Sequence, residues 1–355
     1  AGYGYCTGVD EVSIAIENSM ESRIEWSENI YKNYNVFIQD GLWSDTDNWA
    51  TKQLPTGNDN LVIINANATI ASDDIEVNSL TINEGKSLTL NSGTKLTVIG
   101  DFTNTDADAF TINDGAQVFL NNDNVAATFN MNIIAPDEWS YENINGWQFI
   151  SSPMKNAKIE SYVPTSFNYD LYRYVGNNDL EWLNHKDGAD VNGEFETEFL
   201  QGIGYLASFE SEDVAAFKGI VRHEKSCEFD IVYDDYKDLA NFHLLGNPFT
   251  FDMDWSKVSA SGLAGGYAVV NENGGYDYLS TGTIKVGDGF FVKALSEDAS
   301  LSYNGNLTKR GETVNEEVKF VNVIVSDDNG KDNVVINLSG DDCNDFPKIT
   351  NINKN

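Results

Sequence analysis

Short stretches of alternating apolar and polar residues dominate the region between Ser79 and Leu120. Apolar-polar-apolar triplets begin at Leu80, Leu88 and Leu96, eight residues apart, and turns of the form Asn-x-Gly follow the first two. Strands this short cannot bury an apolar face singly, so they are stable only when they stack on a neighbouring copy. The pattern predicts a short parallel β-solenoid over residues 34–140.

The same region contains an internal repeat. The stretch SLTINEGKSLTL at 79–90 returns as AFTINDGAQVFL at 109–120, so that Leu80 corresponds to Phe110 at an offset of 30 residues. Gly85 and Gly115 occupy the same turn in both copies. The repeat indicates successive copies of one strand-turn-strand unit.

A second, longer repeat follows Ala135-Pro136-Asp137. Three blocks recur in the same order: WQFISSPM at 147–154 with FHLLGNPF at 242–249, 170–184 with 266–280, and 202–213 with 287–298. Each block alternates apolar and polar residues and ends in a turn, as antiparallel strands do. We therefore predict an internally duplicated antiparallel β-sandwich region over 141–312, with halves at about 145–222 and 240–308, and an all-β fold for the whole chain.

The two ends of the chain carry less pattern. Residues 1–33 are predicted to be an N-terminal capping segment of the solenoid. In residues 313–355, two apolar-rich stretches flank Asp328-Asn329-Gly330, a turn typical of a β-hairpin. The remaining tail is interpreted as the possible start of a further module.

Composition changes the picture by excluding partners. The chain has 22 Lys plus Arg against 56 Asp plus Glu, a formal net charge of −34, which repels nucleic acid and anionic membranes. No apolar run reaches the roughly 20 residues that span a bilayer. The three cysteines lack a CxxC spacing. We expect neither nucleic-acid binding nor membrane insertion.

The sequence lacks the motifs of zinc hydrolases and serine hydrolases, whereas its 56 acidic residues leave a glycosidase pair of carboxylates open. The three histidines have no HExxH spacing, no GxSxG stretch occurs, and Cys227 has only His223 nearby in an acidic chain. The glycines at 202–204 and 287–289 recur at equivalent places in both halves, which favours turns over a phosphate loop. The predicted role is non-catalytic, with no required cofactor.

One loop is a candidate calcium site. Calcium prefers six to eight oxygen ligands from a flexible loop, and residues 185–198 are rich in such oxygens. The candidate ligands are Asp187, Asp190, Asn192, Glu194 and Glu196. Their spacing is not that of an EF-hand, so a solvated insertion is the alternative interpretation.

Aromatic residues are the candidates for ligand binding, because their rings can stack on sugars. Trp43 and Trp49 bracket an acidic turn, and the alternative is that they plug the end of the solenoid. The other candidates lie on predicted strands, where core packing is the alternative: Tyr172, Tyr174, Trp182, Tyr276 and Tyr278.

The stretches GWQFISSPM, YDLYRYVGNNDLEWLN, FLQGIGYLASF, FHLLGNPFTFDMDW and VGDGFFVKA resemble regions of large extracellular proteins of the Bacteroidota type. Those regions are adhesin-like or are non-catalytic parts of secreted peptidases, many exported by type IX secretion. The resemblance implies a secreted or cell-surface module that binds a host or matrix protein or a glycan, beside other domains of a larger protein. The alternative is an accessory region of a secreted peptidase or glycoside hydrolase.

Overall fold

The computed structural model describes residues 34–57, 59, 61–139, 146–176, 181–186, 195–271 and 274–305, together with two strands at 320–327 and 330–337. The described chain is all-β and is built from several sheets, as predicted. Its helices are single turns: α3 (Ile159–Tyr162), η2 (Thr46–Asn48), η4 (Asp238–Asn241) and η5 (Trp255–Lys257). The predicted capping segment at 1–33 lies outside the described residues.

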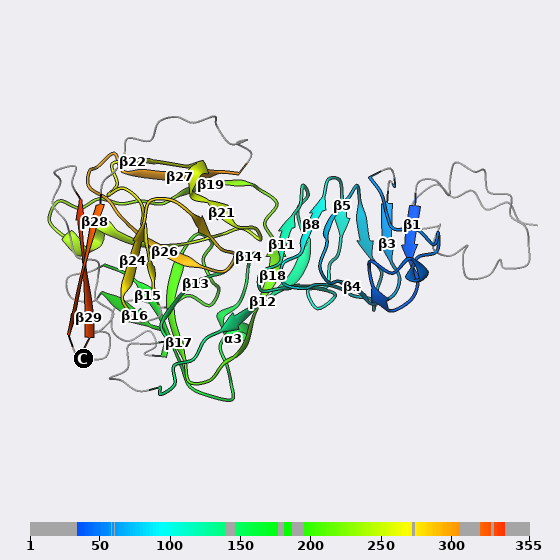
Figure 1. Ribbon diagram of the computed structural model, residues 1–355, viewed down its shortest axis with the longest axis horizontal. Helices are drawn as coiled ribbons and strands as arrows, with labels where there is room; N and C mark the ends of the chain where they lie inside the picture. The colour runs from blue at the N-terminus through cyan, green and yellow to red at the C-terminus, as the bar shows by residue number, and fades with distance from the viewer. Residues whose placement is uncertain are drawn as a thin grey trace, which may run out of the picture.

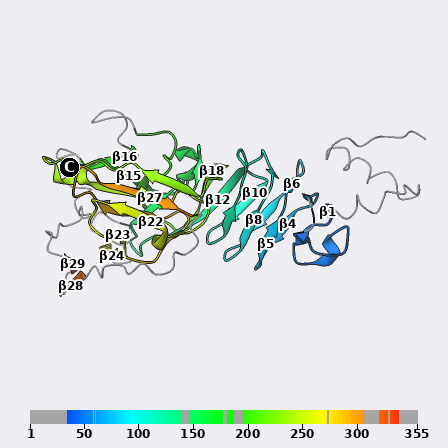
Figure 2. The same cartoon turned by 90° about the horizontal axis from the view of Figure 1, so that it is seen from above.

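Three sheets of parallel strands make up the first part of the chain. The chain passes through the sheets in turn, and each circuit lies beside the previous one (Figures 1 and 2). The first sheet contains β1 (Tyr34–Phe37), β3 (Leu61–Ile64), β6 (Leu80–Ile82) and β9 (Phe102–Thr103). The second contains β2 (Gly41–Leu42), β4 (Ala68–Ile70), β7 (Leu88–Leu90), β10 (Phe110–Asn113) and β12 (Ala126–Ile133), and the third contains β5 (Asp74–Val77), β8 (Lys95–Val98) and β11 (Gln117–Phe119).

The circuit length differs from the repeat seen in the sequence. Leu80 pairs with Phe102, and Leu88 pairs with Phe110, so one circuit here is 22 residues and not 30. The 30-residue offset is one circuit plus one strand-and-turn step of eight residues. It therefore aligns strands of different sheets, because all strands share the same alternation and the same turn.

The second sheet does not end with the parallel strands. β18 (Asp213–Val221) pairs antiparallel with the whole of β12, and β14 (Met154–Lys155) pairs with β18, which gives a seven-stranded sheet. This sheet crosses the boundary predicted at residue 140. The long pairing of β12 with β18 covers the edge that the last parallel strand would otherwise expose.

Two four-stranded antiparallel sheets follow, and both have the same strand order. The first is β13-β17-β15-β16 and the second is β20-β26-β23-β24, so the three repeated blocks fall on equivalent strands. The bounds are β13 (Gln148–Ser151), β15 (Tyr169–Tyr174), β16 (Trp182–Asn184), β17 (Gly204–Phe209), β20 (Phe242–Gly246), β23 (Tyr267–Val270), β24 (Tyr276–Leu279) and β26 (Gly289–Lys293).

Smaller sheets complete the described chain. One contains β19 (Ser226–Phe229), β27 (Ser300–Asn304) and β22 (Val258–Ser261), and another contains β21 (Met253–Asp254) and β25 (Thr283–Ile284). In the region predicted to form a C-terminal hairpin, β28 (Phe320–Asp327) and β29 (Gly330–Asn337) pair antiparallel, and residues 328–329 of the predicted turn lie outside the described residues.

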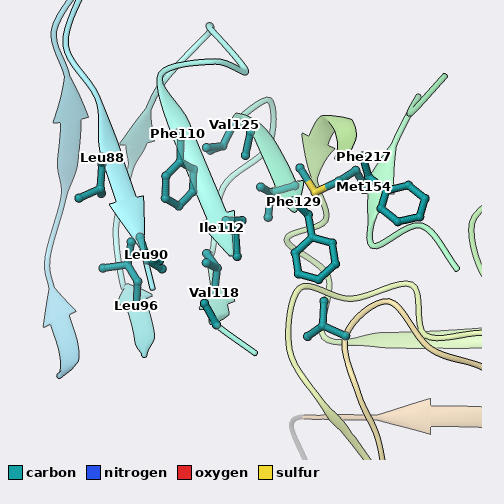
Figure 3. Packing of buried hydrophobic residues seen from close by; sticks show 14 of the residues in the cluster. Leu88, Leu90, Leu96, Phe110, Ile112, Val118, Val125, Phe129, Met154 and Phe217 are labelled. Atoms are coloured by element: carbon teal, nitrogen blue, oxygen red, sulfur yellow. The ribbon is translucent and has the colours of Figure 1, made fainter. Parts of the chain in front are cut away.

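One cluster of buried apolar side chains extends from the parallel circuits into the antiparallel sheets that follow. Leu88, Phe110, Phe129 and Phe217 belong to one cluster of buried side chains, which continues from the parallel circuits across β12 into β18 (Figure 3). Burial of such apolar surface is the main favourable term in folding. The two parts are therefore joined by packing as well as by the shared sheet.

The glycine-rich turns serve the backbone, as predicted. Gly202 and Gly287 have φ of +76° and +88°, a region that glycine adopts without a steric cost. A Cβ on Gly204 would lie 2.4 Å from the carbonyl oxygen of Leu245. Glycine at this strand start allows the two four-stranded sheets to approach closely.

Candidate functional site

The two candidate tryptophans of the first circuit are buried. Trp43 is 2% and Trp49 is 0% exposed, and the indole Nε1 of Trp49 donates a hydrogen bond of 2.8 Å to the carbonyl oxygen of Trp43. The rings of Phe37 and Trp43 lie edge-on to Trp49 at 5.0 and 4.7 Å. Both indole rings are therefore used in packing and are not accessible to a sugar. This burial favours the alternative given above, that the two tryptophans close the end of the parallel circuits.

The five strand aromatics meet in one place, between the two four-stranded sheets. All five belong to or pack against one cluster with Phe291 of β26, and the Phe291 ring centroid lies 5.1 Å from that of Tyr174, 6.0 Å from Trp182 and 6.1 Å from Tyr276. Tyr172 and Trp182 are buried, and Tyr174, Tyr276 and Tyr278 pack against the same cluster. This arrangement supports core packing for all five residues.

Of the five candidate calcium ligands, only Glu196 lies among the described residues. Its carboxylate forms an ion pair with Arg173 of β15, so it is committed to anchoring one end of the loop. At the other end His185 packs edge-on against Phe195 at 5.0 Å. Asp187, Asp190, Asn192 and Glu194 lie outside the described residues, and calcium binding there stays a prediction. Elsewhere in the described chain, no three His, Cys, Asp or Glu side chains are placed to hold a metal ion.

The histidines and the cysteine of the described chain take part in structural contacts. The Nδ1 atom of His223 lies 2.6 Å from Asp123, and Nε2 of His243 lies 2.8 Å from the carbonyl oxygen of Val232. Burial raises the pKa of the Cys227 thiol to about 11, although Arg222 lowers it in part. A thiol with so high a pKa stays protonated near neutral pH, and the thiolate is the nucleophilic form.

A hollow of ≈ 120 Å³ lies between the turn before β17, the strand β19 and the end of β20. Arg222 lines it, but this side chain is already bound on several sides. Its Nη1 donates to Gln201 Oε1 at 3.3 Å, its Nη2 donates to the carbonyl oxygen of Ser226 at 3.1 Å, and its guanidinium carbon lies 5.3 Å from the ring centre of Phe249. Arg222 therefore ties the turn before β17 to β19.

A row of threonines crosses four neighbouring strands of the seven-stranded sheet. Thr69, Thr89, Thr111 and Thr128 are in register on β4, β7, β10 and β12. The first three are half-buried on the outer side, and Thr128 is buried and donates its hydroxyl to the carbonyl oxygen of Ala107 at 2.9 Å. Neighbouring strands lie about 4.8 Å apart, so the hydroxyls repeat at that spacing.

An asparagine row runs beside the threonines. Asn130 Nδ2 donates to Asn113 Oδ1 at 3.0 Å, and Asn113 Nδ2 donates to Asn91 Oδ1 at 3.4 Å. These bonds hold the amides in a fixed orientation. Together the two rows form the threonine face: Thr69, Thr89, Thr111, Thr128, Asn91, Asn113 and Asn130.

The threonine face differs from the other outer surfaces in its charge. None of the strands β4, β7, β10 and β12 contains a charged residue, although the chain has 56 Asp plus Glu. The sheet formed by β5, β8 and β11 carries Asp74, Glu76 and Lys95. The nearest cation on the seven-stranded sheet is Lys218 of β18, which pairs with Asp108 at 2.5 Å. The threonine face is a neutral strip on an acidic protein.

Sequence reasoning missed this face although a signal was present. Apolar-Thr-apolar triplets are centred on each of the four threonines, and triplets of the same kind are centred on Thr81 and Thr97. The last two lie on β6 and β8, which belong to other sheets. Only the strand pairing separates the four threonines that share a face from the two that do not.

Parallel circuits that continue into antiparallel sheets define the chain as an all-β protein, with a neutral polar face as its candidate surface. The chain belongs to the family described as a domain of unknown function (DUF8693), whose model matches residues 37–262. That single match spans both the parallel circuits and the first four-stranded sheet. No curated protein and no solved structure matches the chain. Within the described segments no helix is long and apolar enough to cross a membrane.

Proposed function

We propose that this chain is a non-catalytic, adhesin-like or spacer module of a secreted or cell-surface protein, and that its threonine face binds a neutral glycan. The observation that supports this function is the strip of ordered hydroxyl and amide groups on four strands that contain no charge. Hydroxyls both donate and accept hydrogen bonds, and amides do the same, so they match the hydroxyls of a sugar chain.

The spacer role rests on the proposed architecture. Residues 34–140 form a short β-solenoid in this proposal, and 141–312 form a duplicated β-sandwich region. The parallel pairing of successive circuits supports the first part, and the shared strand order of the two four-stranded sheets supports the second. Stacked circuits give an elongated body, and Figure 1 shows the strands β1, β3, β5, β8 and β11 following one another along the long axis.

Charge favours a neutral glycan over an acidic one. With a net charge of −34, the chain repels a polyanion at long range, and Lys218, the cation in register with Thr128 at the border of the threonine face, is already paired with Asp108. A neutral polysaccharide meets no such barrier. Its hydroxyls can pair with the threonine and asparagine side chains, whose orientation is already fixed by the strand register and the asparagine bonds.

The test is binding of the full chain to a panel of neutral polysaccharides, acidic polysaccharides and matrix proteins. A double variant, Thr89→Glu with Thr111→Glu, places two charges on the threonine face. We expect it to weaken binding to the neutral glycans at least about tenfold, because two carboxylates would lose part of their hydration on contact. The matched control is Thr97→Glu, which changes the same kind of triplet on β8, in another sheet.

Two results would contradict the proposed ligand. The first is equal loss of glycan binding in the double variant and in the Thr97→Glu control. The second is binding to matrix proteins or acidic glycans alone. That result would show that the partner is not a neutral glycan. Absence of binding to the whole panel would leave only the spacer role.

A further inference from the structure

A loop of the second half closes the last parallel circuit. The backbone N of Val118 in β11 donates to the carbonyl oxygen of Thr250 at 2.7 Å, and Thr250 Oγ1 donates to the carbonyl oxygen of Val118 at 2.8 Å. One step further, the backbone N of Asp252 donates to Gln117 Oε1 at 3.1 Å. These bonds continue the sheet of β5, β8 and β11 with a segment 132 residues away in the chain.

A second loop, the turn before β26, packs against β12. A Cβ on Gly287 would lie 3.2 Å from the ring of Phe129 and 3.4 Å from the sulfur of Met131. The backbone N of Ser151 donates to the carbonyl oxygen of Gly287 at 2.7 Å, and Ser151 Oγ donates to that of Asp288 at 2.8 Å. The backbone of Asp288 is thus held between the parallel circuits and both four-stranded sheets.

Carboxylates from three segments lie where these loops meet the circuits. The carboxylate of Asp114 accepts a hydrogen bond from the backbone N of Asn132 in β12 at 3.2 Å, and the carboxylate of Asp252 accepts one from the backbone N of Val286, two residues before Asp288, at 3.1 Å. Asp114 follows β10, Asp252 lies in the first loop and Asp288 in the second; the groups that face Asp288 are these two acids, Lys285 and the neutral phenol of Tyr267. Burial raises the pKa of Asp288 to about 7; Lys285 opposes this shift, and Asp114 and Asp252 add to it. Burial also raises the pKa of Asp252. Near neutral pH, Asp288 therefore binds a proton part of the time.

We infer that the contact between the parallel circuits and the second half responds to pH, and that ionisation of Asp288 loosens it. A protonated Asp288 is neutral and does not repel Asp114 or Asp252. An ionised Asp288 adds a third negative charge against the one cation, Lys285, that faces it. The repulsion acts between the circuits and both loops, which are the segments that hold the junction together.

The direction of the pH effect follows from linkage. The pKa of Asp288 is higher in the folded chain, at about 7, than its ordinary value of 3.8. A raised pKa contributes stability that is fully present below the ordinary value. That contribution is lost as pH rises through about 7, so the junction is weakest in alkaline solution.

The first test is thermal unfolding of the full chain and of Asp288→Asn between pH 5 and pH 8.5. Asparagine has the same shape as the neutral acid and cannot ionise. We expect the wild-type melting temperature to fall relative to that of the variant as pH rises, so that the difference at pH 8.5 is at least about 3 °C larger than the difference at pH 5. The control is Asp73→Asn, an exposed acid far from the junction, which should follow the wild-type pH dependence.

The second test locates the effect by hydrogen exchange in peptides that contain Val118 and Thr250. Above pH 7 these peptides should exchange faster in wild type than in Asp288→Asn, after correction for the intrinsic pH dependence. Asp114→Asn removes one neighbouring charge, so it should move the transition to lower pH. The inference is overturned if wild type and Asp288→Asn differ by the same amount at every pH, or if their junction peptides exchange alike.

Discussion

The parallel circuits and the four-stranded sheets bury their apolar residues in different ways. In the circuits, each strand packs beside an equivalent strand about one circuit away, as Leu88 does beside Phe110. In the second region, rings from distant strands converge, as Phe149 of β13 and Phe291 of β26 do at 5.2 Å. The first kind of core depends on nearest neighbours, and the second depends on the chain having brought two whole sheets together.

This difference separates what each region needs in order to be stable. A circuit is stabilised by any neighbouring circuit with the same alternation of apolar and polar residues. Its buried side chains are therefore mainly aliphatic, and one aliphatic residue can replace another. The aromatic cluster has a defined partner for each ring, and aromatic pairs prefer edge-on or offset geometries. Changes in the aromatic cluster should therefore cost more than polar changes on the circuits.

The largest effect is expected from Phe291→Ala. The neighbours of the Phe291 ring in the described chain include the rings of Phe149, Tyr174, Trp182, Phe242 and Tyr276. Its loss should lower the free energy of unfolding by about 4 kcal/mol, because it removes buried area and leaves a cavity. Urea unfolding followed by tryptophan fluorescence measures this change.

The control for that change is Phe119→Ala on β11. Phe119 is half-buried and stacks on Phe251 at 4.5 Å, so its removal should cost clearly less. If the two variants lose the same free energy of unfolding, the aromatic cluster around Phe291 is no more sensitive to truncation than the edge of the parallel circuits.

A smaller loss, about 2 kcal/mol, is expected from Gly246→Ala. A Cβ at this position would lie 2.2 Å from the Cβ of Ser151 and 2.8 Å from the carbonyl oxygen of Ile203, so the two four-stranded sheets must move apart. The midpoint of urea unfolding reports the loss. Gly57→Ala is the matched control, because nothing lies within 4 Å of its added Cβ; a loss there of the same size would contradict the steric explanation.

The smallest effect is expected on the circuits, from Asn113→Ala. The change removes the amide bonds to Asn91 and Asn130 and should cost about 1 kcal/mol. Thermal unfolding measures it against Asn132→Ala, an exposed asparagine on β12 that should change stability by less than about 0.5 kcal/mol. An effect of Asn113→Ala no larger than that of Asn132→Ala would mean that the asparagine row adds nothing to the circuits.

Much of the fold could be predicted because strand alternation is local. The triplets around Leu80, Leu88 and Leu96 became β6, β7 and β8, and the three repeated blocks fell on equivalent strands. The candidate site was predicted far less well. Trp43 and Trp49 are aromatic residues beside an acidic turn whether they are exposed or buried, and only the packing around Trp49 decides between the two.

The sequence by itself determined that the chain is all-β, where most strands lie and that three blocks recur after residue 146, because these features depend on residues a few positions apart. Tertiary structure alone decided which strands are neighbours. It placed four of six similar threonines on one neutral face, set a circuit of 22 residues from Leu80 to Phe102 and from Leu88 to Phe110, and brought Asp114, Asp252 and Asp288 together. Pairing between distant strands makes these choices, and local triplets of the same kind cannot encode them.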